Sequence, residues 1–341
     1  MMEIGRICAI AEKEFAENIR GRRFLLVLAL FLIIAAIGAW QGIQDYTAAL
    51  ERYMQTLQVA GTGAFSSIAR VRPSVLDVFM RMGGAMSTLG AVLGIAVGFD
   101  LISGEKEDHS LKMLLSHPVY RDEVITGKAL GGIVSVAFAM AVALGIAIAL
   151  LLISGHVPSA DEAGFILIFG LVSFLYLTCG YAIALAMSVV ADRSGKALLY
   201  ALVVFFFLSS VVPAAMTLAA DGIAGEEPDK PTPVDDSDLE TWNAYLEERR
   251  DRDKMRNAIV MTGYIVSPQL NYAEVSRAVT QPLMYLNMHG DPDEAWSHFD
   301  EDDLDYAEVL GHLWKNIVAL LLVPAAFFGL AYVAFLRMDI R

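Results

Sequence analysis

The chain has 341 residues, of which 56% are hydrophobic and only 19% are charged, a composition more apolar than that of soluble domains. Its net charge is −14, and the entire acidic excess lies in residues 221–315, which contain 22 acidic and 8 basic residues. No basic stripe is available to neutralise phosphates, which argues against a nucleic-acid partner. Cys8 lies in a predicted helix and Cys179 in an apolar run, which argues against a disulfide framework and a zinc site.

The first predicted element is an amphipathic helix over residues 3–20. Ile4, Ile7, Ala11 and Phe15 fall at helical spacing on one face, and mainly charged residues occupy the other face. A cleaved signal peptide would need a short apolar core followed by a cleavage site, and neither is present. We therefore predict an uncleaved helix that lies in the membrane interface.

Six apolar runs predict an all-α integral membrane protein, because each is close to the length that crosses the hydrocarbon layer. They are residues 24–44, 82–99, 129–153, 164–190, 197–220 and 316–336. Lys and Arg gather at the ends of these spans that face one side of the membrane, which predicts a cell-membrane protein with both termini in the cytoplasm. Four arginines within residues 45–81 lie on the other side and count against this orientation.

The predicted spans contain no Asp, Glu, Lys, Arg or His within these bounds. Ion-coupled carriers need ionisable groups inside the membrane, because such groups bind and release the coupling ion. The chain also lacks the G-x-x-x-x-G-K-[ST] loop that binds nucleotide phosphates, and it shows no protease motif. We therefore expect a protein that is not itself an enzyme, and any energy for transport must come from another subunit.

The second span carries a glycine at every fourth position, Gly90, Gly94 and Gly98, all on one helix face. In lipid, such a stripe lets another helix approach closely, which predicts a helix-packing surface. The partner helix belongs either to the same chain or to a second subunit.

A charged island follows over residues 100–128, with the sequence DLISGEKEDHSLKMLLSHPVYRDEVITGK. An apolar turn in its middle predicts a short surface helix over residues 111–116, with Ser110 as its N-cap and Pro118 as its stop. Asp122 is predicted to cap the helix that leads into the third span.

This island resembles the first cytoplasmic loop of type-2 ABC transporter permeases, in which an SGE motif precedes a short coupling helix. The matching residues are Ser103, Gly104, Glu105, Leu111, Leu114, Leu115, Pro118, Val119, Arg121 and Lys128. Tyr120 departs from the pattern, because a small hydroxyl residue is usual there.

The resemblance implies a permease subunit that works with a cytoplasmic ABC ATPase, which would bind the ATP, and with a second permease subunit, identical or different. The residues implied in ATPase coupling are Glu105, Leu111, Leu114, Leu115, Pro118 and Arg121. The leucines would supply apolar contacts and the charged residues a rim around them. The substrate is left open by this resemblance.

Prolines predict breaks in the second half of the chain. Pro213 predicts a kink in the fifth span. A charged surface helix is predicted over residues 239–259, and Pro268 and Pro282 predict breaks between the interfacial helices that follow it.

The acidic stretch before the last span lacks the spacing of a calcium loop, so we expect no metal there. Met284, Met288 and His289 could be copper ligands, although packing of the methionines is favoured.

The predicted organisation has three parts: a membrane domain over residues 1–220, an acidic extracytoplasmic segment over 221–315, and a sixth span with a cytoplasmic tail over 316–341. The predicted function is an export-type permease subunit of an ATP-driven transporter. The alternative is a membrane receptor that transports nothing and binds a ligand or partner through its outer segment.

Overall fold

The computed structural model describes residues 4–59, 73–109, 120–230, 239–289 and 306–338, and all regular structure in these ranges is helical. Six helices in the described part of the chain are long and apolar enough to cross a membrane, which confirms the predicted fold class. They are α2 (Arg22–Val59), α3 (Asp77–Gly98), α6 (Arg121–Ile153), α7 (Ala160–Val190), the run from α8 (Ser194–Phe206) to α9 (Val212–Ala224), and α13 (Tyr306–Arg337).

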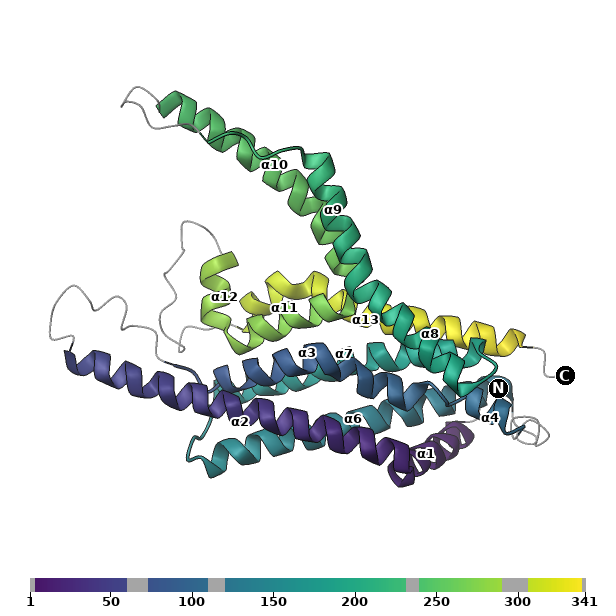
Figure 1. The fold of residues 1–341 in the computed structure, drawn as a ribbon. Helices are drawn as coiled ribbons and strands as arrows, with labels where there is room; N and C mark the ends of the chain where they lie inside the picture. Colours follow the sequence, from purple (N-terminus) through teal and green to yellow (C-terminus); the bar gives the residue numbers. More distant parts are fainter. Residues whose placement is uncertain (1–3, 60–72, 110–119, 231–238, 290–305, 339–341) are drawn as a thin grey trace.

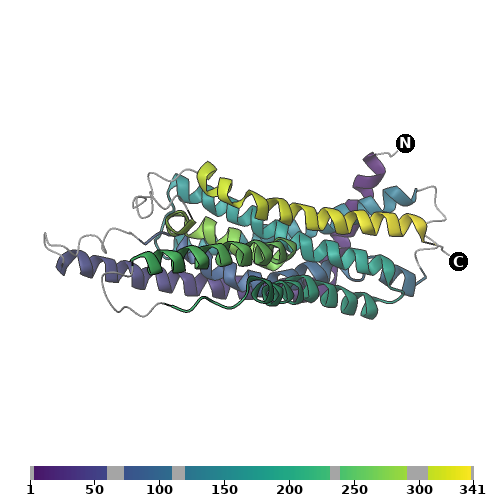
Figure 2. The same ribbon diagram turned by 90° about the horizontal axis from the view of Figure 1, so that it is seen from above.

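Most helices extend beyond the predicted spans. α2, for example, ends at Val59 rather than near residue 44. Hydropathy marks only the part of a helix that suits hydrocarbon, whereas the backbone hydrogen bonds continue into the polar region. Both chain termini lie at the same end of the bundle, together with the short helix α4 (Ser103–Glu107) (Figures 1 and 2). We call this the α4 end.

α7 is the central helix of the bundle, and it packs against α3, α6, α8 and α13. Its close contact with α3 depends on the predicted glycine stripe. A Cβ at Gly94 would lie 2.1 Å from the Leu177 carbonyl oxygen, and one at Gly98 would lie 2.8 Å from the Tyr181 carbonyl oxygen. A Cβ at Gly90 would lie 3.5 Å from the ring of Tyr176, which is an ordinary contact distance. The stripe therefore lies against a helix of the same chain.

The N-terminal helix α1 (Ile4–Arg20) packs along the first half of α6. The predicted apolar face is only partly correct: Ile7 is buried, whereas Ile4 is exposed. Glu14, which was assigned to the charged face, is buried instead. The reason is tertiary, because a cation from α6 meets this carboxylate, as described below.

The predicted irregularity at Pro213 is present. The α-helical pattern changes to a π-turn, η2 (Phe207–Val211), directly before α9, which has Pro213 near its start. Proline has no N–H for the carbonyl four residues earlier, here that of Ser209. The hydroxyl of Ser267, from the segment between α9 and α13, donates to that carbonyl at 3.4 Å.

Between α9 and α13, the described residues form α10 (Leu239–Val266), α11 (Pro268–Thr280) and α12 (Pro282–His289), so the breaks at Pro268 and Pro282 are confirmed. α9 and α10 lie side by side and lead away from the bundle (Figure 1).

α11 differs from the expected interfacial helix, because it packs against α3, α7 and α13 within the bundle. Tyr272 of α11 is fully buried, stacks on Tyr176 with ring centroids 4.5 Å apart, and shares a 2.9 Å hydrogen bond with Ser173. The helix therefore forms part of the core, which its low hydropathy did not indicate.

Candidate functional site

In the sequence, the predicted coupling helix falls between α4 and the start of α6, and both of these elements lie at the α4 end (Figure 1). The predicted coupling residues Leu111, Leu114, Leu115 and Pro118, and the predicted N-cap Ser110, lie outside the described residues. Glu105 and Arg121, on the two sides of that gap, are described. The site can therefore be built from the residues that hold both ends of the segment.

A buried cation joins three helices at this end. The ammonium of Lys128 in α6 lies 2.5 Å from a carboxylate oxygen of Glu14 in α1 and 2.8 Å from one of Glu105 in α4. The side chain of Lys128 is only 2% exposed, and that of Glu105 is 21% exposed. Two carboxylates thus surround one cation, away from water.

Glycines in α6 permit this approach. A Cβ at Gly127 would lie 2.7 Å from Cβ of Ile10, and one at Gly131 would lie 2.6 Å from Cβ of Glu14. Any larger residue would push α1 away from α6 and would separate Glu14 from its partner.

Burial raises the pKa of the Glu14 carboxyl above its usual range, and the neighbouring Lys128 ammonium offsets part of that rise. For the Glu14 carboxylate, the attraction of Lys128 therefore does not cancel the whole cost of its removal from water. Loss of Lys128 would leave two carboxylates without their buried counter-charge.

The start of α4 is held by a serine from the end of α7. The hydroxyl oxygen of Ser188 accepts hydrogen bonds from the backbone N–H groups of Ile102 at 3.0 Å and Ser103 at 2.9 Å, and it also lies 3.2 Å from the Ser103 hydroxyl. All of these groups are buried. The serine of the SGE motif therefore has a local structural role.

The charged residues that follow complete the ends of two spanning helices. Lys106 donates to the carbonyl oxygens of Val189 and Ala191, where α7 ends and its last carbonyls lack helical partners. A carboxylate oxygen of Glu107 accepts from the backbone N–H of Ser194 at 3.2 Å, where α8 begins. α4 thus connects to α7 and α8 by hydrogen bonds as well as by packing.

On the other side of the gap, the guanidinium of Arg121 donates to the carbonyl oxygens of Met338 at 2.7 Å and Leu336 at 3.4 Å. These carbonyls lie at the C-terminal end of α13. Arg121 therefore reaches the last spanning helix, more than 200 positions later in the chain.

The prediction that Asp122 caps the next helix is wrong. α6 begins at Arg121 with Tyr120 at the N-cap position, and a carboxylate oxygen of Glu123 accepts from the Tyr120 backbone N–H at 3.3 Å. Asp122 lies within the first turn, where it accepts from the Glu123 N–H. The glutamate three residues beyond the N-cap takes over because Tyr120 offers no short side-chain acceptor.

The arrangement fixes both ends of the coupling segment to helices of the bundle. Through ion pairs and hydrogen bonds, the two ends of the coupling segment contact α1, α6, α7, α8 and α13. Sequence reasoning missed Glu14, Lys106 and Ser188, for which no sequence signal was available. It included Lys128 only as a match to the permease pattern.

No group of three or more His, Cys, Asp or Glu side chains within the described ranges could hold a metal ion. Met284 and Met288, considered as copper ligands, are 50% and 59% exposed, and the His289 side chain is outside the described residues.

Residues 8–340 match the family model described as ABC-2 family transporter protein. A curated relative from Pseudomonas aeruginosa, named "Probable ABC transporter permease protein NosY", is 29% identical over 200 residues, which cover 56% of this chain and 64% of the relative. A protein of the same name from Stutzerimonas stutzeri is 24% identical over 203 residues, covering 57% of this chain and 65% of that protein. The chain thus matches slightly less than two thirds of the length of these relatives. Because the family match extends over nearly the whole sequence, the chain belongs to the ABC-2 family of transporter proteins.

Proposed function

We propose that this chain is the membrane-spanning subunit of an ATP-driven exporter, and that a separate cytoplasmic ATPase docks on residues 100–128. The observation that carries this proposal is the buried cluster of Lys128, Glu14 and Glu105, which ties the start of the coupling segment to α1 and α6. A movement of the segment would therefore also move α1 and α6, because breaking these buried ion pairs costs free energy.

In this proposal the predicted coupling residues have two roles: some position the segment and others contact the ATPase. Glu105 and Arg121 are directed to partners in their own chain, so they position the segment. The apolar contacts with the ATPase come from Leu111, Leu114 and Leu115, since apolar anchors near an interface centre contribute most of the binding free energy.

The α4 end faces the cytoplasm in this proposal, so both termini are cytoplasmic. The basic residues before α2, within the coupling segment and at the start of α8 support this orientation. Single cysteines test it: one replacing Ser194 should be shielded from an impermeant thiol reagent in intact cells, and one replacing Ser237 should be labelled. The reverse result would overturn the orientation.

A second permease subunit completes the proposed transporter. Large apolar side chains on α8, η2 and α9 are exposed in the single chain, among them Val203, Phe206, Phe207 and Leu218. They face lipid or a second permease, and two-fold pairing is the common arrangement of oligomers.

The deciding experiment is co-purification of the ATPase with the double variant Leu114→Ala and Leu115→Ala. Truncation of two anchors should cost at least about 2 kcal/mol of binding free energy and release the ATPase, while folded yield stays normal. The matched control, Leu246→Ala with Met255→Ala, removes two exposed apolar side chains of α10 and should change nothing.

Normal yield with normal ATPase binding would contradict the coupling assignment. Low yield together with lost binding would place the two leucines against the chain's own helices. A chain that co-purifies with no ATPase at all would favour the alternative, a receptor that transports nothing.

A further inference from the structure

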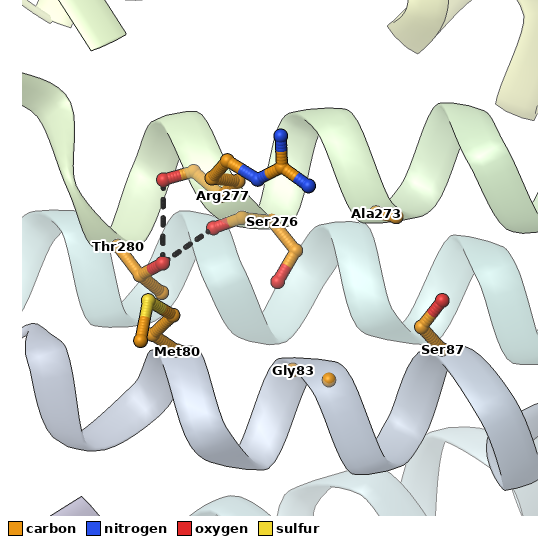
Figure 3. Close-up of a pocket in the computed structure, with 8 residues that line it drawn as sticks. Met80, Gly83, Ser87, Ala273, Ser276, Arg277 and Thr280 are labelled. Carbon is orange, nitrogen blue, oxygen red and sulfur yellow. Dashed lines mark hydrogen bonds between the residues drawn. The ribbon is translucent and has the colours of Figure 1, made fainter. Parts of the chain in front are cut away.

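A pocket opens between α3 and α11, away from the α4 end, with a volume of about 300 Å³ (Figure 3). Its lining residues are Met80, Gly83, Gly84, Ser87, Ala273, Ser276, Arg277 and Thr280. The hydrogen bond from Gln281 to Asp77 at 3.0 Å joins the end of α11 to the start of α3 and places the pocket in the half of the bundle opposite α4.

The polar groups of the pocket come from both helices. The hydroxyl of Ser276 points from α11 toward Gly83 of α3, and the hydroxyl of Ser87 points from α3 toward α11 (Figure 3). Thr280 donates its hydroxyl to the Ser276 carbonyl at 2.8 Å, which keeps that side chain turned along its own helix. The pocket therefore has the half-buried hydroxyl of Ser87 on one wall and the buried hydroxyl of Ser276 on the other.

Arg277 is the one charged residue among the described residues that line the pocket. Its side chain is 66% exposed, and its guanidinium lies 4.0 Å from a carboxylate oxygen of Glu274 on the same helix. A guanidinium with this little engagement can turn toward a ligand. A guanidinium beside hydroxyl donors is the arrangement that binds phosphate oxygens.

The two glycines that line the pocket differ in the space available for a side chain. A Cβ at Gly83 would lie 2.2 Å from the Ser276 hydroxyl oxygen, so packing against α11 requires a glycine there. A Cβ at Gly84 would meet no atom within 4 Å. Glycine destabilises a helix interior relative to alanine, so Gly84 has a cost without a packing reason. Its effect is to keep the pocket open.

We propose that this pocket binds a phosphate ester, with Arg277 holding the phosphate and Ser87 and Ser276 donating hydrogen bonds. Two sources share this chemistry: the headgroup of an anionic phospholipid, whose chains would lie along the exposed face of α3, and a soluble phosphate ester. This proposal is independent of the ATPase assignment.

The test measures binding to the full-length chain in detergent by native mass spectrometry. The probes are dioleoyl-phosphatidylglycerol, glycerol 3-phosphate, and dioleoylglycerol, which lacks the phosphate. The variants Arg277→Gln and Gly84→Leu remove the cation and fill the pocket, respectively. Their matched controls are Arg81→Gln, an exposed arginine of α3, and Gly145→Leu, a spanning-helix glycine with equally open surroundings.

We expect one phosphate-bearing probe per chain to bind more tightly than dioleoylglycerol, and each pocket variant to weaken that binding by about tenfold. A loss for phosphatidylglycerol alone identifies the lipid as the source, and a loss for glycerol 3-phosphate identifies the soluble ester. Equal binding by the wild type and both pocket variants would overturn the proposal, as would an equal loss in the controls. Since Arg277 is exposed, its substitution leaves folding intact and keeps the test decisive if Gly84→Leu lowers the yield.

Discussion

The α4 end and the α9–α10 pair use charge in opposite ways. At the α4 end, Lys128 and Glu14 are almost completely buried and lie 2.5 Å apart although they are 114 positions apart in the sequence. On the α9–α10 pair, Arg256 lies 2.7 Å from Asp221, but both side chains remain partly exposed. The distances are similar and the surroundings are not.

The difference shows that burial, rather than distance, decides what an ion pair contributes. An exposed pair is screened by water and contributes little, whereas removing one member of a buried pair leaves an uncompensated charge. The chain buries its charges where helices from distant parts of the sequence must keep a fixed relation. It leaves them exposed where a helix pair leads away from the bundle.

The largest expected effect is that of Lys128→Met. The substitution leaves the buried Glu14 and the partly exposed Glu105 without their cation, so we expect a loss of about 3–5 kcal/mol in stability, measured as a lower melting temperature in detergent. Lys254→Met, on exposed α10, is the matched control and should leave the melting temperature unchanged.

Adding Glu14→Gln and Glu105→Gln to Lys128→Met should recover part of that loss, because the triple variant removes the charges as well as the cation. If Lys128→Met alone left the melting temperature unchanged, the buried cluster would contribute no more to stability than the exposed pairs, which would contradict this account.

The next largest loss of stability is expected at a buried site whose polar groups are uncharged. The Asn271 amide donates to the carbonyl oxygens of Tyr264, Ile265 and Ser267, and its oxygen accepts from Asn316. Asn271→Ala should leave buried carbonyls without a donor and should cost about 1–3 kcal/mol in thermal unfolding. Asn257→Ala, exposed on α10, is the control, and equal effects of the two would contradict this account.

A smaller effect is expected for Lys106→Ala, since Lys106 is only partly buried. Its loss removes the donor to the last carbonyls of α7 and should cost about 1 kcal/mol. Thermal unfolding beside Lys13→Ala, an exposed lysine of α1, measures the difference. If Lys106→Ala lowered the stability as much as Lys128→Met, the exposure of a lysine would not predict how much its contacts contribute.

The smallest effect is expected for Arg256→Gln, which breaks the short but exposed contact with Asp221. We expect no measurable change in melting temperature at physiological salt, because water and ions replace the interaction. A clear destabilisation that disappears at high salt would mean that α9 and α10 are held together by charge. Exposed and buried ion pairs would then both contribute to the stability of this protein.

Features that depend on neighbouring residues could be predicted from the sequence. The six spans follow from hydropathy along the chain, and the breaks at Pro213, Pro268 and Pro282 follow from the N–H that each proline lacks. The match to the permease pattern in residues 103–128 identified the family, which the comparison over residues 8–340 confirmed.

Contacts between residues far apart in the chain could not be predicted in this way. Glu14 followed the charged pattern of α1 and was therefore placed at the surface, yet Lys128 from α6 makes its burial possible. α11 was too polar to be recognised as part of the core, but Tyr272 finds its ring and hydrogen-bond partners on α7. A polar group can be buried only where another element supplies its partner, and the local sequence does not contain that partner.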